Sequence, residues 1–193
     1  MSARLNQLFQ YAPKQFLEHT VLFTDQLTQP ESAALMRNRI SHFVDLQPLK
    51  ERASARVLPA QHLYSDATLT SYFVPPGGFA IVPADDPPYR FVFLPEFACC
   101  RLLVSRESEQ LLRFQCEQGL GGPMPPPEFE LGSRYVDSFA YWDYTRGHLV
   151  GRIRATAVLV KERDTPWTVF MQQIVGTPGF EQVRLLFSRA LRY

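Results

Sequence analysis

Residues 149–161 read LVGRIRATAVLVK, and this stretch carries the cleanest strand pattern in the chain. Its polar and apolar side chains alternate, with Ile153, Ala155 and Ala157 on one side and Arg152, Arg154 and Thr156 on the other. Successive side chains of a β-strand point to opposite faces of the sheet. The pattern therefore predicts a strand with one face in the core and one wet face carrying the arginines.

Other short β-like segments surround this strand and are separated by proline, glycine and polar turns. The predicted strands cover residues 67–74, 79–82, 90–94, 99–104, 111–116, 135–144 and 167–175. The segments 99–104 and 111–116 predict a hairpin, because the connection at 105–110 is polar throughout. Residues 119–127 (GLGGPMPPP) predict a loop, since this density of glycine and proline excludes both helix and interior strand.

Helical spacing of apolar residues marks both ends of the chain. Over residues 1–50 the pattern predicts helices, one of them starting at a capping box from Thr28 to Glu31 and ending near Gln47. A C-terminal helix is expected over 178–192, with Thr177 as its cap and a stripe of apolar residues. The predicted fold is a single α+β domain over 1–193: N-terminal helices, a central, mostly antiparallel β-sheet or partly open barrel over 53–175, and a C-terminal helix packed on the sheet.

Composition limits the partners. The chain has 193 residues, is 46% hydrophobic and carries 20 basic against 19 acidic side chains, a net charge of +1. Nucleic-acid binding is not expected at such a balance, and no apolar run has the roughly 18 to 20 residues that a membrane crossing needs. Met1 to Gln10 has no signal-peptide pattern. We expect a soluble cytoplasmic protein, with a secreted effector left open.

Cysteine and histidine usage predicts no disulfide framework, metal site or cofactor. Three cysteines are an odd number, and Cys99 and Cys100 are adjacent. The four histidines are scattered without the spacing of metal ligands. The sequence also lacks the local signatures of hydrolases, phosphate loops and dinucleotide sites.

The densest mixture of arginine and aromatic residues lies between 134 and 154. Its members are Arg134, Tyr141, Trp142, Tyr144, Arg146, Arg152 and Arg154. Such residues dominate protein-binding hot spots, so the leading hypothesis is a protein-interaction (adaptor or accessory) domain with a protein partner. The alternative is a sheet whose aromatics lie in the core and whose arginines form its wet face.

A second hypothesis is a cysteine-dependent amidase. The segment from Glu96 to Cys116 resembles the nucleophile hairpin of glutamine deamidases of the cytotoxic-necrotizing-factor type, which would make Cys100 the nucleophile. That family has a histidine on the second strand, where this chain has Gln115 or Cys116, so His62 or His148 would have to act as the base. The alternative is that the cysteines are core residues.

Two further patterns predict phosphate or nucleotide chemistry. Arg52 and Arg56, with Gly77-Gly78 downstream, are similar to the arginine pair and glycine turn of PilZ cyclic-dinucleotide barrels, which implies bidentate phosphate binding. Glu128-Phe129-Glu130 resembles the carboxylate pair of ADP-ribosyltransferase toxins, with Arg56 and Thr70-Ser71 as the upstream elements. Solvated arginines and carboxylates are the alternative in both cases.

Overall fold

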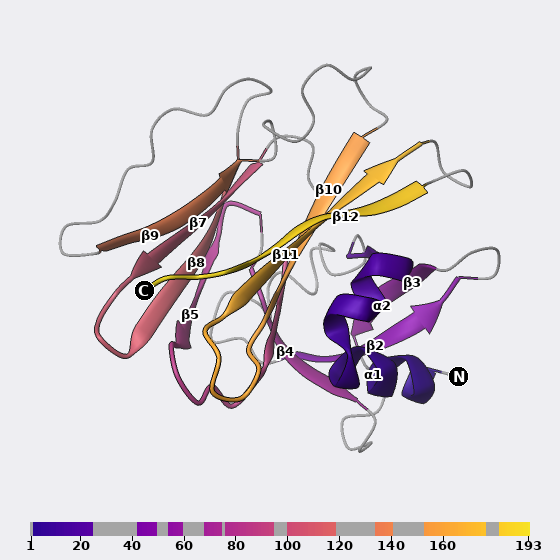
Figure 1. Ribbon diagram of the computed structural model, residues 1–193, viewed down its shortest axis with the longest axis horizontal. Helices are drawn as coiled ribbons and strands as arrows, with labels where there is room; N and C mark the ends of the chain where they lie inside the picture. The colour runs from indigo at the N-terminus through magenta and orange to yellow at the C-terminus, as the bar shows by residue number, and fades with distance from the viewer. Residues whose placement is uncertain are drawn as a thin grey trace.

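The structure is mostly β. It is a computed structural model, and it describes residues 2–24, 42–49, 54–59, 68–74, 76–94, 100–118, 134–140, 153–176 and 182–193. These residues form two helices and twelve strands in two sheets (Figure 1). The predicted α+β class is therefore wrong.

The larger sheet has eight strands in the order β1-β3-β2-β4-β6-β10-β11-β12. These strands are β1 Val21–Phe23, β3 Ser54–Pro59, β2 His42–Pro48, β4 Leu69–Phe73, β6 Phe91–Phe93, β10 Ile153–Val160, β11 Thr168–Val175 and β12 Gln182–Ala190. Neighbours are antiparallel, except that β1 runs parallel to β3 and β4 runs parallel to β6.

The smaller sheet has four antiparallel strands in the order β5-β8-β7-β9. They are β5 Phe79–Pro83, β8 Leu111–Gln118, β7 Cys100–Arg106 and β9 Arg134–Ala140. The predicted hairpin is confirmed, because β7 and β8 pair across a turn at Glu107 to Gln110.

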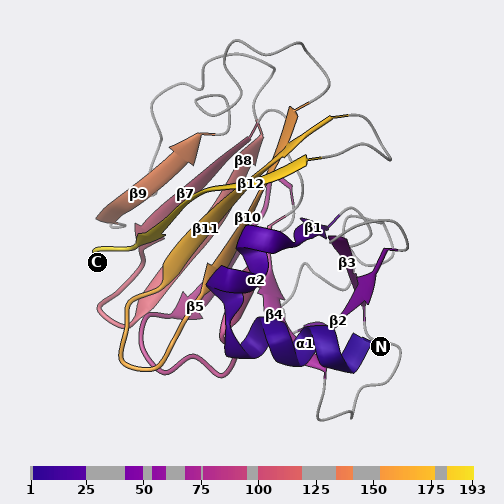
Figure 2. The same cartoon turned by 45° about the vertical axis from the view of Figure 1, so that its right-hand side comes forward.

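The eight-stranded sheet is the middle layer of the molecule. On one face it packs against the four-stranded sheet, and Ala157 and Met171 meet Val104 and Phe114 in the core between them. On the other face lie the helices α1 (Ser2–Tyr11) and α2 (Pro13–His19), as Figure 2 shows. Neither of these described helices has the length and apolar character that a membrane crossing requires.

Burial of both faces corrects the prediction for residues 149–161. On β10, Thr156 is fully buried on the face that was expected to be wet. Arg154 is half-buried, with its guanidinium carbon 5.5 Å from the centre of the Phe23 ring. A strand covered on both sides reads as a nearly continuous apolar run, which explains Val158 to Val160.

The predicted C-terminal helix is also wrong. Residues 182–190 form β12, which pairs with β11 from Val175 opposite Gln182 to Thr168 opposite Ala190. The apolar residues that suggested a helical stripe include Val183 and Phe187, but together with Leu185 these also alternate with period two. Pairing with β11 gives this segment hydrogen bonds that a helix would have to supply internally.

The N-terminal prediction is right only in part. Helices α1 and α2 occupy 2–19, but α2 ends at His19 and is followed by β1. The predicted helix from Thr28 to Gln47 is wrong at its end, because His42–Pro48 is the strand β2; the capping box lies outside the described residues. The strand predictions from 67–74 onward agree with β4 to β11.

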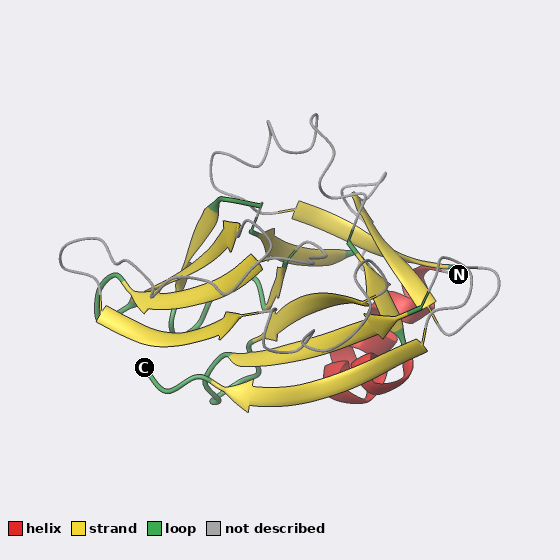
Figure 3. Ribbon diagram, turned by 90° about the horizontal axis from the view of Figure 1, so that it is seen from above, coloured by secondary structure: helices red, strands yellow, loops and turns green. Residues whose placement is uncertain are grey.

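Figure 3 shows the strands of the two sheets from above. Side-chain contacts join the two sheets at two places. Arg189 on β12 lies 3.4 Å from the Asp137 carboxylate on β9, and the rings of Phe139 and Phe187 stack at 5.7 Å. Near the end of β5, the Trp167 indole N–H donates to the Pro83 carbonyl at 3.0 Å. These contacts hold the four-stranded sheet in place against the eight-stranded sheet.

Candidate functional site on the outer face of the four-stranded sheet

Alternation along β7 and β8 assigns each side chain to one face of the four-stranded sheet. Leu102 and Val104 on β7 enter the core, so Arg101, Leu103 and Ser105 lie on the outer face. On β8 the core residues are Leu112, Phe114 and Cys116, and the outer residues are Leu111, Arg113, Gln115 and Glu117. The outer face is therefore predominantly polar on its two central strands, but Arg101, Leu103, Ser105 and Arg113 are each less than 10% exposed, so the centre of this face is not open to solvent.

Large apolar side chains remain exposed at the β5 side of this face. Phe79 is 46% exposed, Ile81 44% and Leu111 38%. Ile81 pairs with Arg113 and Phe79 with Gln115, which puts both on the outer face; Leu111 lies on the same face, opposite Pro83. These three residues, the apolar patch, account for three of the seven large apolar residues exposed in the described part of the chain.

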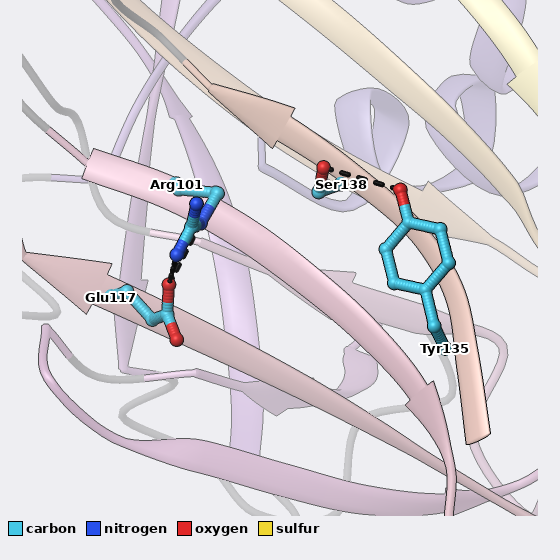
Figure 4. Close-up of polar contacts among 4 residues, drawn as sticks. All are labelled: Arg101, Glu117, Tyr135 and Ser138. Carbon is cyan, nitrogen blue, oxygen red and sulfur yellow. Dashed lines mark hydrogen bonds and ion pairs between the residues drawn. The ribbon is translucent and has the colours of Figure 1, made fainter. Parts of the chain in front are cut away.

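Ion pairs fix two arginines of the outer face, Arg113 next to the patch and Arg101 farther from it on β7. Arg101 and Glu117 are directly opposite on β7 and β8, and the Arg101 Nε donates to Glu117 Oε2 at 2.7 Å, with a second contact through Nη2 (Figure 4). Arg113 forms an ion pair with Glu107 at 3.1 Å, and its guanidinium carbon lies 4.1 Å from the centre of the Phe79 ring. Both guanidinium groups thus already have carboxylate partners, which makes the face a poor trap for phosphate.

The far edge of the face adds two hydroxyl groups. Tyr135, 48% exposed, has its hydroxyl 3.3 Å from the Ser138 Oγ, both on β9 (Figure 4). An irregularity in the pairing of β7 with β9, between Val104 and Ser105, brings residues three apart onto one face. An exposed phenol of this kind suits recognition, because it offers apolar area and a hydrogen-bonding group together.

Only two residues of the predicted arginine and aromatic surface lie in the described part of the structure. Arg134 is exposed at the start of β9 in the four-stranded sheet, whereas Arg154 lies on β10 in the eight-stranded sheet, so the two do not come together. The remaining predicted residues, Tyr141, Trp142, Tyr144, Arg146 and Arg152, lie outside the described residues. Their role stays a prediction.

The cysteine and phosphate hypotheses also remain untested. Cys100 is the first residue of β7, opposite Gln118, while Cys99, His62 and His148 lie outside the description. Cys116 is a free thiol buried in the core. Arg56 is half-buried on β3, but Arg52 is not among the described residues, nor are Glu128 and Glu130.

Metal and small-molecule sites find little support in the ranges that the structure covers. No group of three or more His, Cys, Asp or Glu side chains is placed there to hold a metal ion. A depression of about 650 Å³ lies beside α1 and is lined by Arg4, Gln7, Leu8, Gln10 and Tyr11. Its described lining comes from one helix and brings no converging set of catalytic groups.

Sequence reasoning missed the apolar patch. In the run FAIVP from Phe79 to Pro83 every residue is apolar, so the sequence does not reveal which side chains face out. The outward position of Glu117, the partner of Arg101, was easier to predict, because Arg113, Gln115 and Glu117 form one alternating polar series. No protein-family model matches the chain, and neither does any curated protein, so the functional argument depends on this geometry.

Proposed function

We propose that this protein is a non-catalytic protein-interaction domain that binds its partner at the β5 side of the outer face of the four-stranded sheet. The observation that carries the proposal is the exposed apolar patch of Phe79, Ile81 and Leu111, with the guanidinium of the buried Arg113 against the Phe79 ring. Contiguous exposed apolar residues with a polar surround are characteristic of protein-binding surfaces, whereas single exposed ones are common everywhere.

Covering the patch would contribute usefully to affinity. If Phe79, 46% exposed, has about 200 Å² of surface, roughly 90 Å² of it is in water. At about 25 cal/mol per Å², burying that area contributes roughly 2 kcal/mol. Ile81 is exposed to a similar fraction, so these two residues can act as binding anchors.

The patch is also preorganised. The guanidinium of Arg113 lies over the Phe79 ring and forms an ion pair with Glu107. A partner therefore meets side chains that are already fixed, and the entropy cost of ordering them on binding is reduced.

Site-specific crosslinking tests the proposal. A photoreactive benzoylphenylalanine is placed at Phe79 in cells that naturally make the protein. The control position, away from the four-stranded sheet, is Tyr11 of α1, which is 93% exposed. We expect a discrete crosslinked protein from position 79 and none from position 11. That protein is then identified and purified for binding measurements.

A matched pair of variants measures the contribution of the patch. Ile81→Lys puts a charge into the patch, whereas Val175→Lys makes the same kind of change at an aliphatic residue, 37% exposed, on β11. Ile81→Lys should raise the Kd for the purified partner at least tenfold, and Val175→Lys should leave it unchanged. Equal crosslinking from both positions, or equal Kd values for both variants, contradicts the proposal.

A further inference from the structure

The four-stranded sheet ends at β5 with an unpaired main-chain edge. The Gly78 carbonyl accepts from the Cys116 N–H at 2.9 Å, and the Ala84 N–H donates to the Gln110 carbonyl at 2.8 Å. Hydrogen-bonded positions alternate along an antiparallel pair, so Gly78, Ala80, Val82 and Ala84 face β8. The N–H and C=O groups of Phe79 and Ile81 therefore point away from the sheet.

These groups have no hydrogen-bond partner among the described residues. The free edge is bounded at Pro83, where proline has no N–H and the carbonyl is taken by Trp167 at 3.0 Å. Proteins usually protect such edges with charged side chains, but β5 contains none. The same two residues, Phe79 and Ile81, also hold the exposed side chains of the apolar patch.

Charge distinguishes the two ends of the edge. Asp85 and Asp86 follow β5 and are exposed, and Glu109 is exposed in the adjoining turn. The neighbouring Arg106 is engaged with the carbonyls of Ser108 and Glu109. The three carboxylates outnumber Arg106 at the Pro83 end of β5, which favours a positively charged group on whatever pairs with the edge.

A second copy of this chain fits that requirement poorly. Two β5 strands paired antiparallel about Ile81 would place Asp85 opposite Gly77 of the other copy, with no cation to meet it. An extended segment of a different protein, with alternating apolar side chains and a lysine or arginine at one end, satisfies both the hydrogen bonds and the charge.

From these observations, and resting on the proposed function, we infer that β5 takes up such a segment as an added strand. Its main chain bonds to the N–H and C=O groups of Phe79 and Ile81. Its apolar side chains lie beside the apolar patch, and in the antiparallel direction its basic N-terminal end lies beside Asp85 and Asp86.

Synthetic peptides test this inference on the purified full-length protein. The probe is a fluorescently labelled peptide of two lysines followed by alternating valine and threonine, and its Kd is measured by anisotropy. Two versions carry N-methyl groups, on the valines or on the threonines, and so block opposite edges of the peptide strand. We expect one methylated version to bind like the parent and the other to lose at least tenfold in affinity.

Protein variants test the same edge from the other side. Ile81→Pro removes the outward N–H and keeps the pairing with β8, and Ile81→Ala removes only the side chain; circular dichroism checks the fold of both. Ile81→Pro should bind at least tenfold more weakly than Ile81→Ala. Asp85→Lys should shift the preference toward a peptide with two glutamates in place of the lysines.

The failures of the two proposals are distinguishable. Equal binding of both methylated peptides, or no peptide binding while the crosslinked partner still binds, overturns strand addition and leaves the protein-interaction function standing. A dimer seen by light scattering that Ile81→Pro converts to a monomer assigns the edge to a second copy and also overturns the inference. If Ile81→Lys abolishes binding of the crosslinked partner but leaves the Kd for the peptide unchanged, the inference is also overturned.

Discussion

Replacing Gln172 with leucine removes a side chain that joins β11 to the end of α2 and to β1. Gln172 on β11 is 1% exposed. Its Oε1 accepts from the Leu22 N–H at 3.2 Å, and its Nε2 donates to the carbonyls of Leu17 and Thr20 at 2.7 and 2.6 Å. It thereby satisfies carbonyl groups at the C-terminal end of α2, which has no glycine cap, and fixes β1 beside it.

The expected cost follows from the groups left without partners. Leu17 and Leu22 are fully buried, so the carbonyl of one and the N–H of the other lose hydrogen bonds where water cannot replace them. Each such loss costs about 1 to 3 kcal/mol. Thr20 is only half-buried and can be hydrated. We expect Gln172→Leu to lower the free energy of unfolding by about 3 kcal/mol, allowing for the apolar surface that leucine gains.

Urea unfolding followed by tryptophan fluorescence and circular dichroism measures this loss. With a slope of about 2 kcal/mol per molar urea, the midpoint should fall by about 1.5 M. Gln15→Leu is the matched control, because Gln15 is exposed on α2, and its effect should stay within about 0.5 kcal/mol. A Gln172→Leu protein within about 1 kcal/mol of the parent would refute the role assigned to these hydrogen bonds.

Three further changes have defined outcomes. Burial, with a smaller effect from Tyr89, raises the pKa of Tyr72 from 10.0 to about 12. The folded state therefore favours the neutral phenol, so its contribution to the free energy of unfolding is present below pH 10 and lost as the pH rises toward 12. Tyr72→Phe should accordingly flatten the decline of the unfolding free energy at alkaline pH. Arg189→Met removes the ion pair with Asp137. We expect the free energy of unfolding in urea to fall by about 1 kcal/mol, and by less in high salt. An unchanged value would show that the contact does not hold the sheets together. Cys116 should resist iodoacetamide in the native protein and react in urea, as followed by peptide mass spectrometry; rapid native labelling would contradict its burial.

Strand positions were predictable where alternation and turn residues agreed. The β7–β8 hairpin is the clearest case, because Leu112, Phe114 and Cys116 alternate with Arg113 and Gln115 next to a polar turn. Both signals are local, so they do not depend on the rest of the fold. Part of the candidate site, the outward position of Arg113, follows from the same alternation.

The ends of the chain were not predictable in this way. Between 180 and 191 the apolar residues fit a helical stripe, and Val183, Leu185 and Phe187 fit a strand equally well. Local spacing cannot choose between them, because the choice depends on whether β11 offers an edge for pairing. The apolar patch was hidden for a related reason, since FAIVP is apolar at every position and only the packing of the sheets shows which side faces out.

The sequence by itself determined that a strand lies within 149–161, where the structure has β10 from Ile153 to Val160, since the alternation there admits few other structures. Only the tertiary structure decided what lies on each side of it: the four-stranded sheet covers one face and the helices cover the other, so Thr156 is buried rather than wet. Strand formation depends on the period of neighbouring residues, whereas burial of a face depends on layers contributed by segments far along the chain.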